Sequence, residues 1–424
     1  MDTARSSAGR SLPARVSKAV FLVSVASLGI IQIPFTNFNI VATDVIFLAG
    51  GGIWVVTLVF RQSRVRWHNF YWLLIFYIVA LTTSCYLSEN QLTSFERLPA
   101  EVYLVGLCVL TFNMLEKRDD VRQAVCAWLI GAGFAAMVGL ITIPLFYFTP
   151  QSSLLDFLTY HYGAVPVGDY PRITATFVSA SMLCNYLNAA LIVALAGKAA
   201  GWLNEKLAWA LIITSFVCSV FTISVGLGGV FLGLGVWFWY LSRESHPAES
   251  RVALATGITA AVAFLVLAIF ALTPYPGGKT ISTLPFIDYP VMASGRVLVW
   301  RDAIQTFAER PITGKGLGLP VANVIFPNSE GSLSLLTDAH NSFLSVAAQN
   351  GIVGLAAFAL IVLALVRRWI RPGPLKPIIF GIGLAIFCSF VYQGLTGSFE
   401  NARHLWILIG IFLAADSMQK DAPS

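Results

Sequence analysis

The stretch from Val252 to Thr273 reads VALATGITAAVAFLVLAIFALT and contains no charged residue. A helix needs about 20 mostly apolar residues to cross the ~30 Å hydrocarbon core of a bilayer, because it rises only ~1.5 Å per residue. Every backbone polar group must also be satisfied inside the segment, and an α-helix achieves this. The stretch therefore predicts a membrane-spanning helix and a bilayer as the solvent for this chain.

The composition of the whole chain points the same way. Of the 424 residues, 57% are hydrophobic and 11% are charged, and the mean hydropathy is +0.76. One soluble core cannot bury this much apolar sequence. The sequence predicts an all-α polytopic membrane protein with about twelve transmembrane helices and a single domain over residues 1–424. The apolar runs lie near residues 19–35, 41–60, 70–87, 99–115, 122–147, 173–197, 207–224, 227–241, 252–273, 342–366, 377–396 and 404–416.

The basic residues indicate the orientation of these runs. They stand in short clusters between runs, which favours topology over nucleic-acid binding as the reason for the net charge of +6. If residues 1–18 lie inside as the head of an uncleaved first span, most of the 27 Lys and Arg fall on inner segments, as the positive-inside rule requires. Both termini are then expected in the cytoplasm, and the protein is expected to be a multi-pass membrane protein. The outer side holds only Arg97, Arg172, Lys279, Arg296, Arg301, Arg310, Lys315 and Arg403.

Two outer segments are long, near residues 148–171 and 274–341, and long loops in compact proteins are usually functional or disordered. From Gly295 to Glu309 the second, periplasmic loop has helical periodicity. Polar side chains occupy the side opposite the apolar one, so we expect an amphipathic helix on the protein or membrane surface. Its apolar residues are Val297, Trp300, Ala303, Ile304, Phe307 and Ala308.

Two arginines are expected at outer helix starts. Arg296 opens the amphipathic helix, and Arg172 follows Pro171 at the predicted start of a span. The helix dipole disfavours an unpaired cation there unless an acid or a bound anion completes the site. The pair suggests a phosphate or diphosphate clamp, because guanidinium offers planar bidentate donors. The alternative is snorkelling or an ion pair, for example with Asp169, Asp288 or Glu400.

His340 is the candidate general base. Asp338 is a plausible N-cap for the run that begins at Ser342, which places His340 in the first helical turn at the outer boundary. A helix N-terminus lowers the pKa of histidine and favours the neutral ring that accepts a proton. The alternative is an ordinary packing histidine. His161 and His404 are also outer but lack a comparable polar neighbourhood, whereas His68 and His246 fall on cytoplasmic loops.

Three further segments interrupt the apolar pattern. The glycine-rich segment 311–318 lacks the GxxxxGK[ST] pattern of a phosphate loop and predicts a tight turn, with an anion nest as the alternative. Gln349 to Gly351 predicts a break or bend in the span from Ser342. Glu400, Asn401 and Arg403 form a weaker polar cluster, for which an ordinary interfacial loop is favoured.

Taken together, these segments resemble the O-antigen ligase and O-antigen polymerase superfamily. The resemblance rests on residues 295–300 (GRVLVW), 310–318 (RPITGKGLG), 340–344 (HNSFL) and 350–354 (NGIVG), in this order and spacing, and on residues 172–177 (RITATF). A Ser-Arg-Gly of many members stands here as Ser224-Val225-Gly226, so a third family arginine has no counterpart.

The resemblance implies a GT-C-like glycosyltransferase that uses an undecaprenyl-diphosphate-linked glycan as donor. Arg172 and Arg296 would bind the diphosphate, and His340 would position or deprotonate the acceptor hydroxyl. No cofactor and no metal are expected, because the sequence has no HExxH and no tight His/Asp cluster. Further residues in or beside the matching motifs are expected to bind substrate: Trp300, Asn341, Asp338, Gly316 and Arg310.

The residues leave the acceptor open. It is lipid A core in an O-antigen ligase, which we favour, or the growing glycan in an O-antigen or exopolysaccharide polymerase. A transporter of lipid-linked sugars is the more distant alternative. That class calls for charges near the bilayer midplane, each costing at least ~2.5–3.5 kcal/mol. This chain keeps its basic residues at the ends of spans, and only acids such as Asp44 are ambiguous.

Overall fold

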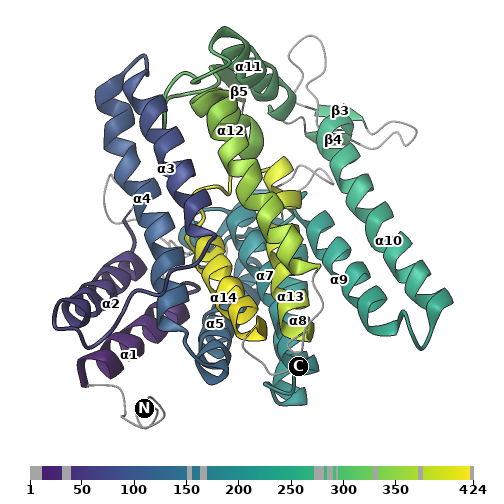
Figure 1. The fold of residues 1–424 in the computed structure, drawn as a ribbon. Coiled ribbons are helices and arrows are strands. Elements are labelled where there is room, and N and C mark those ends of the chain that lie inside the picture. The colour runs from purple at the N-terminus through teal and green to yellow at the C-terminus, as the bar shows by residue number, and fades with distance from the viewer. Residues whose placement is uncertain are drawn as a thin grey trace, which may run out of the picture.

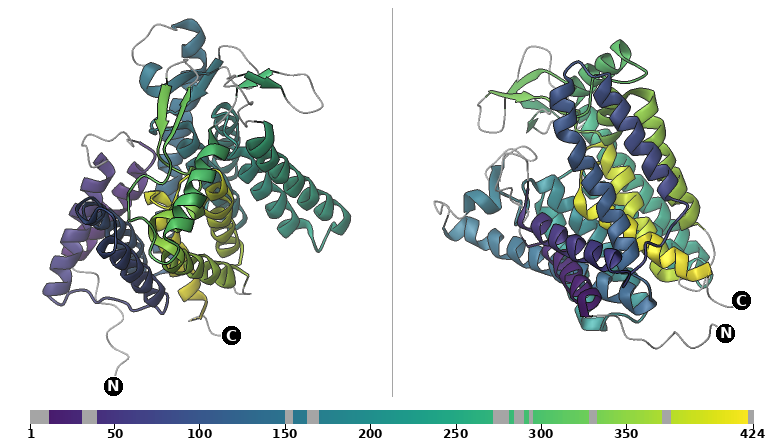
Figure 2. Two further views of the ribbon diagram at one scale, coloured as in Figure 1. Left: turned by 90° about the horizontal axis from the view of Figure 1, so that it is seen from above. Right: turned by 60° about the vertical axis from the view of Figure 1, so that its left-hand side comes forward.

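The computed structural model describes residues 12–30, 40–149, 155–162, 170–271, 281–283, 290–292, 295–327, 333–370 and 376–420. These residues are mostly helical, and the long helices form one bundle with short elements gathered at one end (Figures 1 and 2). The bundle helices are α1 (Leu12–Ser27), α2 (Ala42–Val59), α3 (Tyr71–Tyr86), α4 (Gln91–Met114), α5 (Arg118–Phe148), α7 (Ala180–Ala199), α8 (Glu205–Phe221), α9 (Leu227–Ser242), α10 (Pro247–Val266), α12 (Ser342–Trp369), α13 (Lys376–Ile386) and α14 (Arg403–Lys420). Shorter helical pieces are α6 (Leu155–Leu158), the π-helices η1 (Leu267–Ala271) and η2 (Phe387–Tyr392), and the 3-10 turn η3 (Gln393–Leu395).

Each predicted apolar run overlaps one of these bundle helices, but only some reach spanning length. In the described residues, six helical segments are long and apolar enough to cross a membrane. Shorter apolar helices such as α3 and α9 fall below that length, and the expected number of twelve spans is not confirmed. The six segments are Ala42–Val59, Arg118–Phe148, Ala180–Ala199, Pro247–Ile269, Ser342–Trp369 and Pro377–Leu395.

The centre of the bundle is built around α7 and α14. Nearly all side chains of α7 are buried, and the described residues of α14 from His404 to Asp416 are buried as well. Figure 1 shows α14 surrounded by other helices, whereas α10 lies at one edge beside α9. A helix that is apolar on all sides belongs in the interior of a bundle. The start of α1 and the end of α14 lie at the end of the bundle opposite the amphipathic segment (Figures 1 and 2).

The described residues are mostly helical, as predicted, although three short antiparallel hairpins interrupt the helices. They lie in or at the border of the two segments that the sequence marks as long loops, where the chain has no apolar run long enough to span a membrane. The first pairs β1 (Thr159–Tyr162) with β2 (Tyr170–Ile173), the second β3 (Ile281–Thr283) with β4 (Pro290–Met292), and the third β5 (Val324–Pro327) with β6 (Leu333–Leu336).

The expected amphipathic helix is present as α11 (Arg296–Glu309), which packs across the start of α12. Its buried face is not the predicted one: Val299, which the pattern omits, is buried, and Ile304, which the pattern includes, is exposed. Val299 and Ala303 are fully buried, whereas Ile304 is 53% exposed. The helix docks on a small buried cluster of Ala303, Val321, Ala339 and Ala348, and so lies against the protein.

Helix α12 is bent where the sequence predicts a break. Gly351 has φ +64° and ψ −166°, so the helical hydrogen bonds stop there and resume beyond it. The glycine-rich segment 311–318, called the glycine turn below, supplies hydrogen bonds to the carbonyl groups that the bend leaves without helical partners. Lys315 N–H donates to Ala348 O and Gly316 N–H donates to Gln349 O, both at 2.9 Å. Buried backbone groups need such partners. The turn predicted at 311–318 therefore fixes the bend of α12.

Candidate functional site

His340 lies immediately before α12, not in its first turn. Asn341 caps the helix, since its side-chain oxygen accepts from the N–H groups of Phe343 and Leu344, both at 3.0 Å. The expectation that Asp338 is the N-cap is therefore wrong, because a cap must stand directly before the first helical residue. His340 has φ +48°, a left-handed conformation that is uncommon outside glycine.

Asp338 holds the imidazole in place. Its Oδ2 atom accepts from the backbone N–H of His340 at 3.3 Å and lies 3.4 Å from His340 Nδ1. Ser345 Oγ donates to Asp338 Oδ1 at 3.1 Å, and Ser398 Oγ donates to Oδ2 at 2.7 Å. Asp338 is thus a fixed orienting group, while the His340 side chain keeps 45% of its surface exposed.

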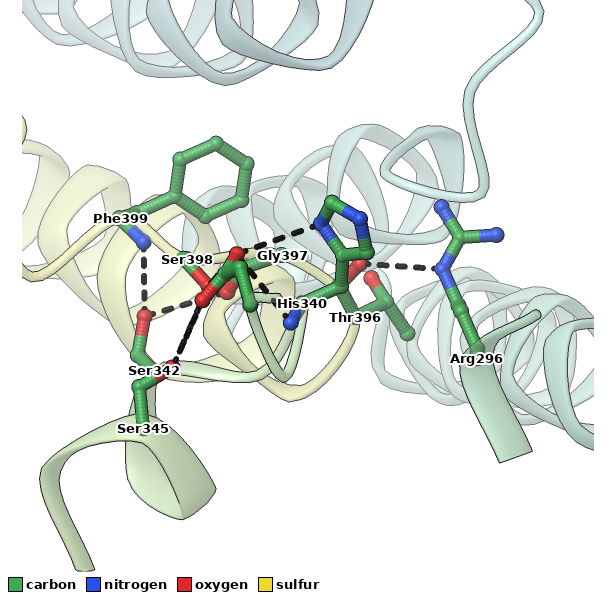
Figure 3. Close-up of polar contacts among 9 residues, drawn as sticks. Arg296, His340, Ser342, Ser345, Thr396, Gly397, Ser398 and Phe399 are labelled. Atoms are coloured by element: carbon green, nitrogen blue, oxygen red, sulfur yellow. Dashed lines mark hydrogen bonds and ion pairs between the residues drawn. The ribbon is translucent and has the colours of Figure 1, made fainter. Parts of the chain in front are cut away.

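The pKa of His340 is lowered from its ordinary value. Burial lowers it, the Asp338 carboxylate raises it, and the positive charge of Arg296 lowers it further. The lowered pKa favours the neutral ring, which is the form that a general base needs. The effect of Arg296 also indicates that the cation and the ring share one site, and Figure 3 shows both side chains beside the Thr396–Phe399 segment.

Arg296 begins α11, as the sequence predicts. Its Nε atom donates to the carbonyl of Thr396 at 3.4 Å, which ties the helix start to the segment after η3 (Figure 3). One turn further, Trp300 is partly buried, and its indole Nε1 has no hydrogen-bond partner among the described residues. Substrate binding by Trp300 stays a prediction.

Arg172 lies in strand β2, and the expectation of a helix start at this residue is wrong. The helix begins only at Ala180, with Ser179 as its N-cap, because residues 170–173 pair with β1. Arg172 Nε donates to the carbonyl of Thr222 at 3.0 Å, at the turn between α8 and α9. Arg172 is therefore positioned by a hairpin and a turn.

The two arginines are linked through the turns that they contact. Gln393 Nε2 donates to the carbonyl of Gly226 at 2.7 Å, which joins the α8–α9 turn of Arg172 to the segment that holds Arg296. Thr396 in turn donates its backbone N–H to Gln393 O at 3.0 Å. The two arginines are thus joined through these turns, and a shared anion site for both stays a prediction.

The segment from Gln393 to Glu400 is the part of the site that the sequence motifs do not single out. Several of its residues contact the segment around His340. Asn341 Nδ2 donates to Leu395 O at 3.0 Å, and Ser342 Oγ donates to Gly397 O at 3.1 Å. Phe399 N–H donates to Ser342 Oγ at 2.8 Å. The sequence signals for this segment are weak: polar and small residues interrupt apolar sequence between the last two runs, and Glu400 belongs to the polar cluster noted above.

Glu400 ends this segment as a buried acid. It is 8% exposed, and its Oε2 atom has no hydrogen-bond partner among the described residues. Burial raises the pKa of Glu400 to about 7, and the negative charge of Asp338 contributes. Glu400 therefore belongs to the electrostatic surroundings of Asp338 and His340, not to an ordinary exposed loop.

Arg403 and the ambiguous acid Asp44 are partners. Arg403 Nε lies 2.5 Å from Asp44 Oδ1, and the Tyr103 hydroxyl donates to the same oxygen at 2.8 Å. A buried ion pair that crosslinks α2 and α14 accounts for both charges. Asp44 is therefore no evidence of a transport pathway.

The sequence interpretation of His404 is wrong. His404 is 4% exposed in α14, and its Nε2 atom lies 2.6 Å from Asn185 Oδ1 in α7. Asn185 also donates to Gln393 Oε1 at 2.8 Å. His404 thus has a polar neighbourhood after all, supplied by residues that are distant in sequence. The side chain of His161 lies outside the described residues.

Arg310 and Gly316 lie apart from His340, at the far end of α11 and in the glycine turn. Arg310 Nε lies 3.3 Å from Glu89 Oε1 in the α3–α4 connection. Gly316 has φ +133°, and a Cβ there would stand 1.9 Å from Ser88 Oγ. These contacts are structural, and substrate binding by either residue stays a prediction. Among the described residues, no group of three His, Cys, Asp or Glu side chains is arranged to hold a metal ion.

Comparison with known proteins adds one finding. Residues 207–359 match the family model described as O-antigen ligase. The matched region runs from α8 through the bend of α12 and contains Arg296, Asp338 and His340, whereas Arg172 and the 393–400 segment lie outside it. No curated protein matches the chain.

Proposed function

Since residues 207–359 of this chain belong to the O-antigen ligase family, which confirms the resemblance of its motifs, we propose that the protein is an O-antigen ligase. It transfers a glycan from undecaprenyl diphosphate to lipid A core. The family supports a ligase-type or polymerase-type activity in a multi-pass membrane protein. The donor, the acceptor, the GT-C class and the metal-independent reaction are our proposal.

The observation that carries the proposal is the arrangement of His340, Asp338 and Arg296. A neutral imidazole, a carboxylate that orients it and a cation occur at one place. This set suits attack by a hydroxyl group on a carbon whose leaving group is anionic. A packing histidine has no need of a carboxylate that is itself held by two serine hydroxyls.

In the proposed reaction, the acceptor hydroxyl oxygen attacks the anomeric carbon of the donor sugar. The new C–O bond forms as the bond between that carbon and the diphosphate oxygen breaks, and undecaprenyl diphosphate leaves with the electron pair. His340 Nδ1 faces Asp338, so the neutral ring carries its proton there and Nε2 accepts the hydroxyl proton.

Arg296 and Arg172 bind the diphosphate in this proposal. Each Nε atom is committed to a backbone carbonyl, which fixes the guanidinium plane before substrate arrives. Preorganised cations stabilise the negative charge that grows on the leaving group without further rearrangement. Trp300 and Asn341 are substrate-binding residues in this proposal, and Asn341 also fixes the first turn of α12.

The proposed topology places this end of the bundle at the periplasmic face of the inner membrane, with both termini cytoplasmic. It is supported by the charge bias between loops and by the position of α11 at the end of the bundle opposite the start of α1 and the end of α14. The donor glycan and the lipid A core would meet there in the outer leaflet of that membrane.

The test uses the purified full chain in nanodiscs with lipid-linked repeat units, with and without lipid A core. Transfer to the core is expected, and His340→Ala is expected to lower the rate by ~10²–10⁴. Arg296→Ala should insert normally and also lose glycan transfer. His246→Ala and Arg301→Ala are the matched controls, because both residues are exposed and lie outside the site.

The outcomes separate the alternatives. Glycan lengthening in the absence of core would replace the ligase proposal by the polymerase. Wild-type turnover in His340→Ala or Arg296→Ala would refute the roles of these residues. A wild-type protein that transfers no glycan to either acceptor would refute the proposed function itself.

A further inference from the structure

An open groove of ≈ 440 Å³ lies between α11 and the β5–β6 hairpin, away from the reacting residues. Ligand sites usually measure ~300–1,000 Å³. Helix α11 lines it with Asp302, Gln305, Thr306 and Glu309, four positions that recur at three- and four-residue spacing and so share one face. The other walls come from Lys315, Pro320, Val321, Ala322, Asn323, Leu335 and Thr337.

The walls of the groove are fixed by hydrogen bonds. Thr306 Oγ1 donates to Val321 O at 3.0 Å, and Val321 N–H donates to Thr337 O at 3.0 Å. Asp302 Oδ2 accepts from Asn323 N–H at 3.2 Å. The helix, the segment after the glycine turn and the strand end therefore form a preformed site.

The chemistry of the walls suits a neutral or amino sugar. Carboxylate, amide and hydroxyl groups pair with sugar hydroxyls, and the aliphatic surfaces of Val321 and Leu335 suit sugar C–H faces. Asp302 and Glu309 bring two carboxylates against the single cation of Lys315, so the groove disfavours a diphosphate. An open groove also lets a polymer enter and leave.

The groove shares its wall with the segment that carries His340. Thr337 lines it and stands directly before Asp338. Ala339 and Val321 are buried in the cluster on which α11 docks. Because Asp302, Gln305 and Glu309 point from a different side of α11 than Arg296, a glycan in the groove lies apart from the bond that reacts.

We propose that the groove between α11 and the β5–β6 hairpin is a subsite for sugar units of the polysaccharide distant from the reacting bond. This inference rests on the proposed function for its biological meaning. It adds a binding site that acts on the length of the glycan, because a short substrate does not reach the groove.

The test is direct binding of glycan without lipid or diphosphate. The probe is the surface polysaccharide of the source organism, released by mild acid and added to the full chain in detergent, with calorimetry as the readout. The test variant is Gln305→Ala/Glu309→Ala. These side chains bond each other at 3.2 Å, so removing both leaves no orphaned partner.

The matched control is Asp119→Ala/Gln123→Ala. It removes the same kind of exposed helical pair, bonded at 2.6 Å, from α5 outside the groove. A second test variant, Thr337→Trp, fills the groove while leaving the backbone bonds of Thr337 in place.

Wild type, His340→Ala and the control are expected to bind the polysaccharide equally. The double variant should bind about tenfold more weakly, as expected for the loss of two hydrogen-bonding side chains, and Thr337→Trp should abolish binding. In transfer assays the double variant should raise KM for long glycans and leave a single repeat unit unaffected.

Equal binding by wild type and both test variants, or no binding by wild type, would overturn the subsite. Binding that is lost in the variants while wild type transfers no glycan would refute the proposed function and leave the subsite standing. The two failures are therefore distinguishable.

Discussion

The Asp338 carboxylate contacts His340 twice, through the backbone N–H at 3.3 Å and through Nδ1 at 3.4 Å. Ser398, sixty residues further along the chain, donates to the same carboxylate oxygen. The orientation of the imidazole therefore depends on the fold around the last two helices as well as on the loop that carries it. This dependence makes Asp338 a positioning residue whose effect is measurable.

Asp338→Asn is expected to lower kcat for glycan transfer by about 10- to 100-fold, less than the loss of the base itself, with little change in KM. The carboxylate raises the pKa of His340, so its neutralisation lowers that pKa. The acidic limb of the pH–rate profile, where His340 becomes protonated, should therefore move to lower pH. Asp119→Asn, on the exposed start of α5, is the control. An acidic limb that stays at the wild-type pH in Asp338→Asn would show that Asp338 does not act on the residue that titrates.

Arg296→Lys and Arg172→Lys are expected to raise KM for the lipid-linked donor by about 10- to 100-fold, the loss of one hydrogen bond to a charged group. Lysine keeps the positive charge but has no planar guanidinium group. It therefore cannot donate to the backbone carbonyl from one nitrogen and present two further N–H donors to an anion. Initial rates at varied donor concentration check this. Arg301→Lys, from the exposed side of α11, should behave as wild type. Full activity in both lysine variants would show that only the positive charge of each arginine is needed, and not its planar geometry.

The sequence predicts the elements whose signal is local. The apolar runs, the amphipathic helix from Arg296 and the break at Gly351 follow from hydrophobic periodicity and glycine, and each is found. The buried face of α11 is predicted less well. The apolar pattern omits Val299 and includes Ile304, whereas the docking of the helix on Ala339 and Ala348 decides which side is buried.

The remaining features depend on pairing between distant residues, which leaves no periodic trace. Residues 170–173 form a strand because residues 159–162 pair with them, so Arg172 leaves the expected helix. His404 in α14 contacts Asn185 in α7 only in the folded bundle, because the two residues are 219 positions apart in the sequence. The segment from Gln393 to Glu400 likewise has no recognisable residue spacing. Most of its hydrogen bonds to the His340 region use its backbone groups or reach Asp338, and such bonds impose no pattern on the sequence.

Glu400→Gln is expected to stabilise the protein at pH 8 and to change little at pH 4. Burial raises the pKa of Glu400 from 4.5 to about 7, so the folded state binds more protons than the unfolded state between these values. Stability is then lost as the pH rises through this window, by an amount on the order of 3 kcal/mol, because each pKa unit corresponds to ~1.4 kcal/mol. Glutamine is neutral throughout and removes this loss. Thermal midpoints in detergent from pH 4 to pH 8 measure it, and parallel curves for variant and wild type would contradict a buried titrating acid.

Gly351→Ala is expected to destabilise the protein and to lower activity, although residue 351 lies outside the reacting group. The residue has φ +64°, and a Cβ there would stand 2.2 Å from the carbonyl oxygen of Ile312, so both conformation and contact oppose alanine. Left-handed strain alone costs ~1–3 kcal/mol, and the overlap forces the glycine turn off the bend of α12, the helix that follows His340 in the chain. Gly52→Ala is the matched control, since nothing lies within 4 Å of its added Cβ and alanine favours a helix by up to ~1 kcal/mol. Thermal midpoint and transfer rate should fall together in Gly351→Ala and stay at or above wild type in Gly52→Ala, whereas an unchanged rate at a lower midpoint would show that the bend supports the fold but not the position of His340.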